Sequence, residues 1–153
     1  GQPEVAEFLP DWKSTRAQRL DWTLNEDIPD NKAFLSAVPN LTDEIIRLGI
    51  ILKETAEFIG FCTSGIKEEL NGSNREVAFA ISKHYRNQGY TTKAVKALIQ
   101  YLFQHTNVKH LNAVVLPHNA SSNKVIQKCG FYLNGHAQID GEQFNHYVLK
   151  KKQ

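Results

Sequence analysis

The sequence contains no methionine and only two cysteines, Cys62 and Cys129, among its 153 residues. Two cysteines are too few for a disulfide scaffold, so we expect reduced thiols and a cytoplasmic protein. Because the first residue is Gly1 and methionine is absent, we also expect the N-terminus to be processed, tagged or truncated.

Long apolar runs and a strong excess of one charge are absent as well. No run is long enough to cross a bilayer, and the first residues do not have the pattern of a signal peptide. The net charge of +2 is too small to indicate nucleic-acid binding without a localised basic patch. We therefore expect neither a membrane nor a nucleic acid as a partner.

Signatures of metal and hydrolase chemistry are also missing. The six histidines do not have the spacing of metal ligands, so we expect no metal site. The Gly-x-Ser-x-Gly turn of many serine hydrolases does not occur.

The patterns that are present predict one globular domain over residues 1–153. At 41% hydrophobic and 22% charged residues, the chain can bury one core. Residues 1–40 have an interrupted helical pattern. After this the periodicity predicts, in order, strands at 44–54, 57–67 and 75–82, a helix from Thr92, a strand at 109–117, a helix at 119–130, and strands at 131–139 and 143–151. This order predicts an α/β (α+β) fold, with helices packed on a mixed sheet.

The helix predicted after Thr92 begins in an unusual setting. Its apolar stripe is typical of a helix that lies on a core, and comprises Val95, Leu98, Ile99, Leu102 and Phe103. The first turn leaves backbone N–H groups without partners, and it follows a loop that contains Arg86 and Gly89. Such a loop suits phosphate, although a capped helix after a basic loop explains the pattern equally well. The single glycine excludes a Walker A loop and a dinucleotide fingerprint.

Two motifs carry a family resemblance. The run "RNQGYT" resembles the Arg/Gln-x-x-Gly-x-Gly/Ala coenzyme A signature of the GNAT N-acetyltransferases. The run "NASSNKVIQKCGF" is similar to one in the ribosomal-protein N-terminal (RimJ/RimL-like) branch of that family. "REVAFAIS" stands where the family has its fourth strand, and "QPEVAEFLPDW" resembles its first helix.

The resemblance implies a GNAT-like, mostly antiparallel sheet of about six strands with helices on both faces, and we expect the family's first strand to be absent from this sequence. It also implies an enzyme that moves an acetyl group from acetyl-CoA to an amine, either a protein N-terminal amine or a small-molecule amine. A homodimer is left open. The alternative is a non-catalytic GNAT-like module that binds CoA or a partner. Thr91, which stands where the family has glycine or alanine, favours that alternative.

The same resemblance assigns residues to the cofactor. The residues expected to contact acetyl-CoA are Ile81, Ser82, Arg86, Asn87, Gln88, Gly89, Tyr90, Thr91, Thr92 and Asn119. Backbone N–H groups near Ile81 would stabilise the oxyanion that forms during acyl transfer.

Two residues are assigned to catalysis on the same basis. Glu76 would be the general base, directly or through water; the alternative is a strand carboxylate paired with Arg75 or another neighbour. Ser122 would protonate the leaving thiolate. Asn119 and Ser122 also suit the start of a helix as caps, and Asn119 fits both roles.

Overall fold

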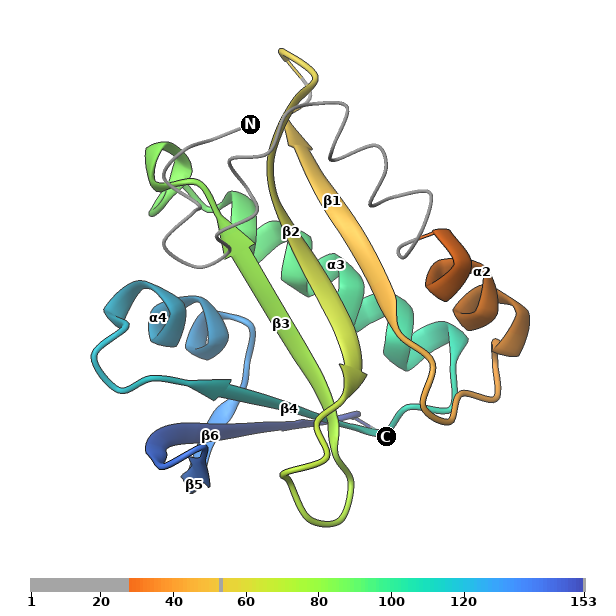
Figure 1. Ribbon diagram of the computed structural model, residues 1–153. Coiled ribbons are helices and arrows are strands. Elements are labelled where there is room, and N and C mark those ends of the chain that lie inside the picture. Colours follow the sequence, from red (N-terminus) through yellow and green to blue (C-terminus); the bar gives the residue numbers. More distant parts are fainter. Residues whose placement is uncertain (1–27, 53, 153) are drawn as a thin grey trace.

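The computed structural model describes residues 28–52 and 54–152 (Figure 1). The described elements are helix α2 (Ile28–Ala37), strands β1 (Ile46–Leu52), β2 (Glu57–Ile66) and β3 (Arg75–Ile81), the 3₁₀-helix η4 (Lys83–Tyr85), helix α3 (Tyr90–His105), strand β4 (His110–Val115), helix α4 (Ala120–Lys128), and strands β5 (Tyr132–Ile139) and β6 (Glu142–Lys150). The elements predicted from residue 44 onward are confirmed, with boundaries that differ by a few residues. The helix predicted at "QPEVAEFLPDW" lies outside the described residues.

The strands of the described chain form a six-stranded sheet in the order β1-β2-β3-β4-β6-β5. The neighbours β3 and β4 are parallel, and the other neighbouring pairs are antiparallel. This confirms the predicted mixed, mostly antiparallel sheet. The β5–β6 hairpin turns at Asp140 and Gly141, whose φ values of 52° and 81° match the positive φ values of a type I′ turn.

One main core joins the sheet to the helices. The predicted stripe of α3 is buried at Val95, Leu98, Ile99 and Leu102, while Phe103 packs partly buried against the same cluster. Phe34 of α2 and Ile126 of α4 have no exposed surface and belong to this cluster too. Burying each such side chain stabilises the fold by about 1.5–3 kcal/mol. The prediction that helices cover both faces of the sheet stays a prediction.

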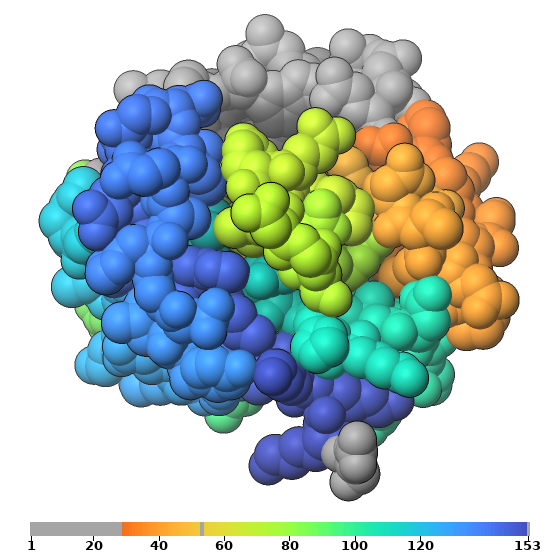
Figure 2. All heavy atoms as spheres, turned by 90° about the horizontal axis from the view of Figure 1, so that it is seen from below, coloured from red at the N-terminus to blue at the C-terminus, as the bar shows by residue number. Residues whose placement is uncertain are grey.

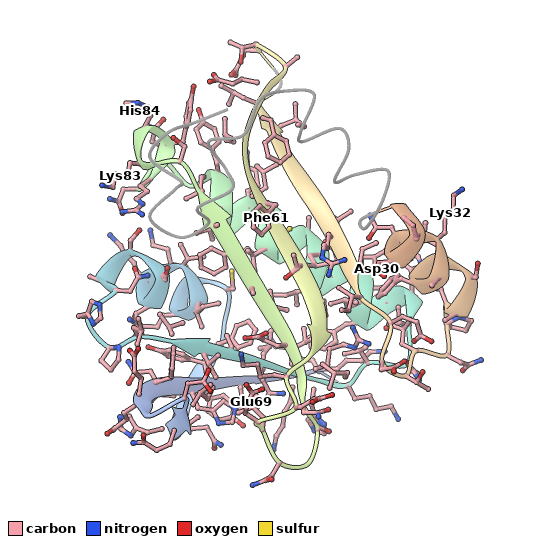
Figure 3. The ribbon with its side chains drawn as sticks, in the orientation of Figure 1. Asp30, Lys32, Phe61, Glu69, Lys83 and His84 are labelled. Carbon is pink, nitrogen blue, oxygen red and sulfur yellow. The ribbon has the colours of Figure 1, made fainter. Side chains whose placement is uncertain are left out.

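The two faces of β3 differ because side chains alternate along a strand. Val77 points into the main core beside α3. Ala80 lies on the other face and clusters with Phe58 and with Phe61, which is opposite it on β2 (Figure 3). Glu76 and Ala78 share this second face by alternation.

The two ends of β3 lead to different surroundings. Seen from below, the yellow-green loop before β3 fills the surface between the orange α2–β1 segment and the blue β5–β6 hairpin (Figure 2). The other end of β3 leads through η4 into α3 (Figure 1). Among the described residues, no helix has the length and apolar character needed to cross a membrane.

Candidate active site

A wedge between β3 and β4 is the first part of the candidate site. The parallel register of these strands pairs Glu76 with Asn112, near the start of both, and the strands diverge beyond this pair (Figure 1). The Ser82 N–H donates to Ile59 O of β2 at 2.9 Å. Because adjacent backbone N–H groups point to opposite edges of a strand, the Ile81 N–H is directed toward the β4 side. That orientation is the one required of the predicted oxyanion donor.

The loop at the wide end of the wedge presents backbone N–H groups. Asn87 and Gly89 have φ values of 60° and 83°, and Gly89 is the N-cap of α3. The Lys93 N–H donates to Gly89 O at 3.0 Å, so the preceding N–H groups lie in the first turn at the positive end of the helix dipole. A Cβ built on Gly89 would meet no atom within 4 Å. The space on the Cβ side of Gly89 is therefore open.

The first turn of α4 faces this loop. Asn119 is the N-cap of α4, and its Oδ1 accepts the Ser122 N–H at 3.1 Å. The capping role considered for Asn119 is therefore confirmed. This cap engages the Ser122 backbone, and the half-buried Ser122 side chain lies at the pocket.

A pocket lies between the end of β3, the loop before α3 and the start of α4. Eight of the residues assigned from the sequence line it: Ile81, Arg86, Asn87, Gly89, Thr91, Thr92, Asn119 and Ser122. Thr91 is buried, with 6% of its surface exposed. The structure thus brings together two motifs that lie about 30 residues apart in the chain.

Three other assigned residues support the loop and do not line the pocket. Ser82 is buried, and its Oγ accepts the His84 N–H at 3.4 Å. The Gln88 Nε2 donates back to His84 O at 2.9 Å. The ring of Tyr90 packs edge-on against Tyr85, with 6.1 Å between the ring centroids. Their side chains are therefore used in shaping η4 and the start of α3.

Glu76 lies apart from the pocket, at the narrow end of the wedge. It is five residues from Ile81, which corresponds to roughly 17 Å along a strand. Its side chain is half-buried, and burial raises the pKa of its carboxyl group; Lys67 opposes this rise and Glu69 adds to it. Glu69 is labelled in the loop near this end, whereas Lys83 and His84 lie at the other end of β3 (Figure 3).

Arg75 does not pair with Glu76. The Arg75 guanidinium donates to Ser64 Oγ at 3.3 Å and to the carbonyls of Thr42 and Glu44 at 3.1 and 2.9 Å. Among the described residues, no hydrogen bond or ion pair of the Glu76 carboxylate is found. Neighbouring residues of a strand point to opposite faces, which explains why Arg75 turns to other partners.

Two cationic residues of the pocket were not predicted. Lys124 and Lys128 lie one helical turn apart on α4 and line the same pocket as Arg86. The four-residue spacing between these two lysines, which follow Asn119 on the same helix, is the sequence signal that could have identified them. Together with Arg86 they give the pocket a positive lining. Within the described chain, no cluster of three His, Cys, Asp or Glu side chains could hold a metal ion.

Tyr85 is a further pocket residue that sequence reasoning missed. Its hydroxyl donates to Glu57 Oε1 at 2.5 Å, and this hydrogen bond is the main cause of the raised pKa of Tyr85. The bond joins the start of β2 to the loop that leads into α3.

Sequence comparison finds relatives of this chain among N-acetyltransferases. The uncharacterized N-acetyltransferase p20 of Bacillus licheniformis is 31% identical over 96 residues, which cover 63% of this chain and 53% of the relative. The chain thus spans about half the length of that relative.

Two solved structures share the fold. The ribosomal-protein-S5-alanine acetyltransferase from Vibrio fischeri has a TM-score of 0.68 and 19% identity, covering 96% of this chain and 85% of its own. The aminoglycoside acetyltransferase AAC(6')-Ib in complex with coenzyme A has a TM-score of 0.59 and 20% identity, covering 70% of this chain and 66% of its own. The family model of the acetyltransferase (GNAT) domain matches residues 1–132. The chain therefore belongs to the GNAT acetyltransferase domain family.

Proposed function

We propose that residues 1–153 form a single-domain N-acetyltransferase that moves the acetyl group of acetyl-CoA to an amine. The observation that carries the proposal is the joint pocket of the two motifs. The first turn of α3, opened by Gly89, faces the capped first turn of α4, and the end of β3 supplies the third wall.

The residues present fit the phosphate groups of acetyl-CoA. Backbone N–H groups at a helix N-terminus bind anions, and the lack of a Cβ at Gly89 leaves them accessible. Arg86, Lys124 and Lys128 add positive charge around the same pocket. Arg86 would hold the pyrophosphate beside the loop, and the two lysines would attract the remaining phosphate.

The catalytic roles follow from the placement of three groups. Acetyl-CoA, when bound, supplies an activated thioester carbonyl. The Ile81 N–H, directed toward the wedge, donates to the carbonyl oxygen as negative charge develops on it. The Glu76 carboxylate takes the proton of the amine through a chain of water molecules, because roughly 17 Å of β3 separates it from Ile81. The Ser122 hydroxyl donates a proton to the departing sulfur, and its position at the pocket supports this role.

The second face of β3 is proposed to receive the acceptor amine. Ala78 and Ala80 are small, and they separate Glu76 from the end of the strand on this face. The acceptor is either a protein N-terminal amine or a small-molecule amine. The two structural neighbours include one acetyltransferase of each kind, a ribosomal-protein-S5-alanine acetyltransferase and an aminoglycoside acetyltransferase.

We further propose that the protein acts in the cytoplasm, because Cys62 and Cys129 are both free and buried. Burial raises the pKa of each thiol to about 11, which keeps it protonated and unreactive. A homodimer is compatible with the proposal, and its presence can be measured by light scattering.

Two measurements test the function. Saturating acetyl-CoA should raise the melting temperature, since a ligand that binds the folded state stabilises it by mass action. Free thiol release should then be followed with a panel of small amines and N-terminal peptides. The absence of any thermal shift with acetyl-CoA would contradict the proposal. A thermal shift without thiol release on any acceptor would favour the non-catalytic CoA-binding module.

A further inference from the structure

Asn123 of α4 uses every hydrogen-bonding position of its amide group. Its Nδ2 donates to the carbonyl oxygens of Leu116 and Asn119 at 3.0 and 2.8 Å. Its Oδ1 accepts from the Tyr147 hydroxyl at 2.7 Å and from Asn145 Nδ2 at 3.0 Å. The residue is 9% exposed, so these bonds form largely away from water.

The four partners belong to two separate parts of the fold. Leu116 and Asn119 lie in the turn that joins β4 to α4, whereas Asn145 and Tyr147 lie in β6. Tyr147 is itself buried, with 2% of its surface exposed. The Asn123 side chain therefore ties the turn that precedes α4 to the strand beside β4.

The N-cap alone does not fix this turn in the same way. The Asn119 Oδ1 holds the Ser122 N–H, a local bond that sets the start of the helix but not its direction relative to the sheet. Asn123 adds the long-range restraint. A buried polar group that loses one partner costs about 1–3 kcal/mol, so a fully bonded Asn123 amide favours one placement of this turn over the alternatives.

We propose that Asn123 is a positioning residue for acyl transfer. By holding the carbonyl of Asn119 against its own amide and anchoring to Tyr147, it keeps the first turn of α4 at the pocket. The Ser122 hydroxyl is thereby placed where the thiolate leaves. This inference rests on the proposed function, because it assigns Asn123 a task only through Ser122.

The test is a double-mutant cycle on kcat that combines Asn123→Ala with Ser122→Ala. Misplacement of a reacting group by about 1 Å lowers rates by up to roughly 100-fold, so Asn123→Ala should lower kcat by at least roughly tenfold. In the Ser122→Ala background the same change should lower kcat by less than about twofold, because the group that it positions is already gone.

Asn107→Ala is the matched control for lost stability. Asn107 Oδ1 accepts the Leu41 N–H and Asn107 Nδ2 donates to Leu41 O, both at 3.1 Å. Asn107 lies in the connection between α3 and β4, at the end of α3 away from the pocket. Asn107→Ala also loses two hydrogen bonds to backbone atoms, and this loss should lower the melting temperature. Its effect on kcat, measured at a temperature where all variants are folded, should be the same with and without Ser122.

Tyr147→Phe serves if Asn123→Ala does not fold. It removes one bond to Asn123 Oδ1 and keeps the buried ring. Its smaller fall in kcat should likewise disappear in the Ser122→Ala background. Equal fold-losses in both backgrounds, or wild-type turnover in Ser122→Ala, would overturn the positioning role alone. A wild-type protein that neither binds acetyl-CoA nor releases thiol would overturn the proposed function and this inference with it.

Discussion

Replacing Gly89 with alanine tests the phosphate-binding loop most directly, because Gly72 provides a matched control. Both glycines have positive φ, 83° and 73°, and a Cβ on either one would meet no atom within 4 Å. Gly89 lines the pocket, whereas Gly72 lies in the loop between β2 and β3, at the other end of β3. The two substitutions therefore share their backbone strain and differ in what lies in front of the new methyl group.

The strain and the binding loss can be estimated separately. An L-residue in the left-handed region costs about 1–2 kcal/mol, so both variants should lose roughly 2–8 °C in melting temperature. If a phosphate approaches the first turn of α3 past Gly89, as proposed, the methyl group at Gly89 also occupies that space. Losing one hydrogen bond to a charged group costs about 1.5–3 kcal/mol, or roughly 10- to 150-fold in Kd.

Calorimetric titration with CoA gives the decisive number. Gly89→Ala should bind CoA roughly 10- to 150-fold more weakly than wild type, and Gly72→Ala should bind as wild type does. If both variants kept the wild-type Kd while losing the same stability, the loop at Gly89 would not contact phosphate. Gly89→Val, with a larger side chain, should abolish binding altogether.

Three further variants have expected outcomes. Glu76→Gln should lower kcat by roughly 100- to 10,000-fold and remove the acidic limb of the pH profile. In wild type this limb should lie above the usual glutamate range, because burial raises the Glu76 pKa and the base works only when ionised. The same variant should melt at or above the wild-type temperature at neutral pH, since burial penalises the ionised Glu76 carboxylate there and the neutral amide carries no such penalty; a variant with wild-type kcat would remove Glu76 from the mechanism. Arg86→Glu should weaken CoA far more than a pantetheine fragment that lacks the pyrophosphate, and equal weakening in competition binding would make Arg86 structural. Lys124→Gln should reduce the preference for CoA over dephospho-CoA in the same assay, and an unchanged preference would exclude contact between Lys124 and the additional phosphate.

The elements of the fold could be predicted because their signals are local. The stripe from Val95 to Leu102 is a helical period, and the alternation along 75–82 is a strand period, so each segment carries its own evidence. The family was predictable for a related reason, since its two motifs are short and contiguous; the family model confirms that prediction.

The details of the site depend on packing that the sequence does not express locally. Gln88 stands inside the loop motif, but its amide donates back to His84 O and its side chain does not line the pocket. Lys124 and Lys128 become part of the pocket because α4 packs against the loop that precedes α3. Glu76 is separated from the pocket by the length of β3. The sequence pattern predicted this length, but it did not indicate where the pocket ends.

The divergence of β3 and β4 has a consequence for amide hydrogen exchange. Backbone amides of β3 that point toward β2, such as those of Ala80 and Ser82, are held by that strand's ladder. The amides of Phe79 and Ile81 alternate to the opposite edge, which β4 has already left. These two should exchange with solvent sooner than their neighbours in the same strand. A molecule that fills the wedge would slow every second amide and leave those between unchanged, a period-two pattern that global stabilisation does not produce.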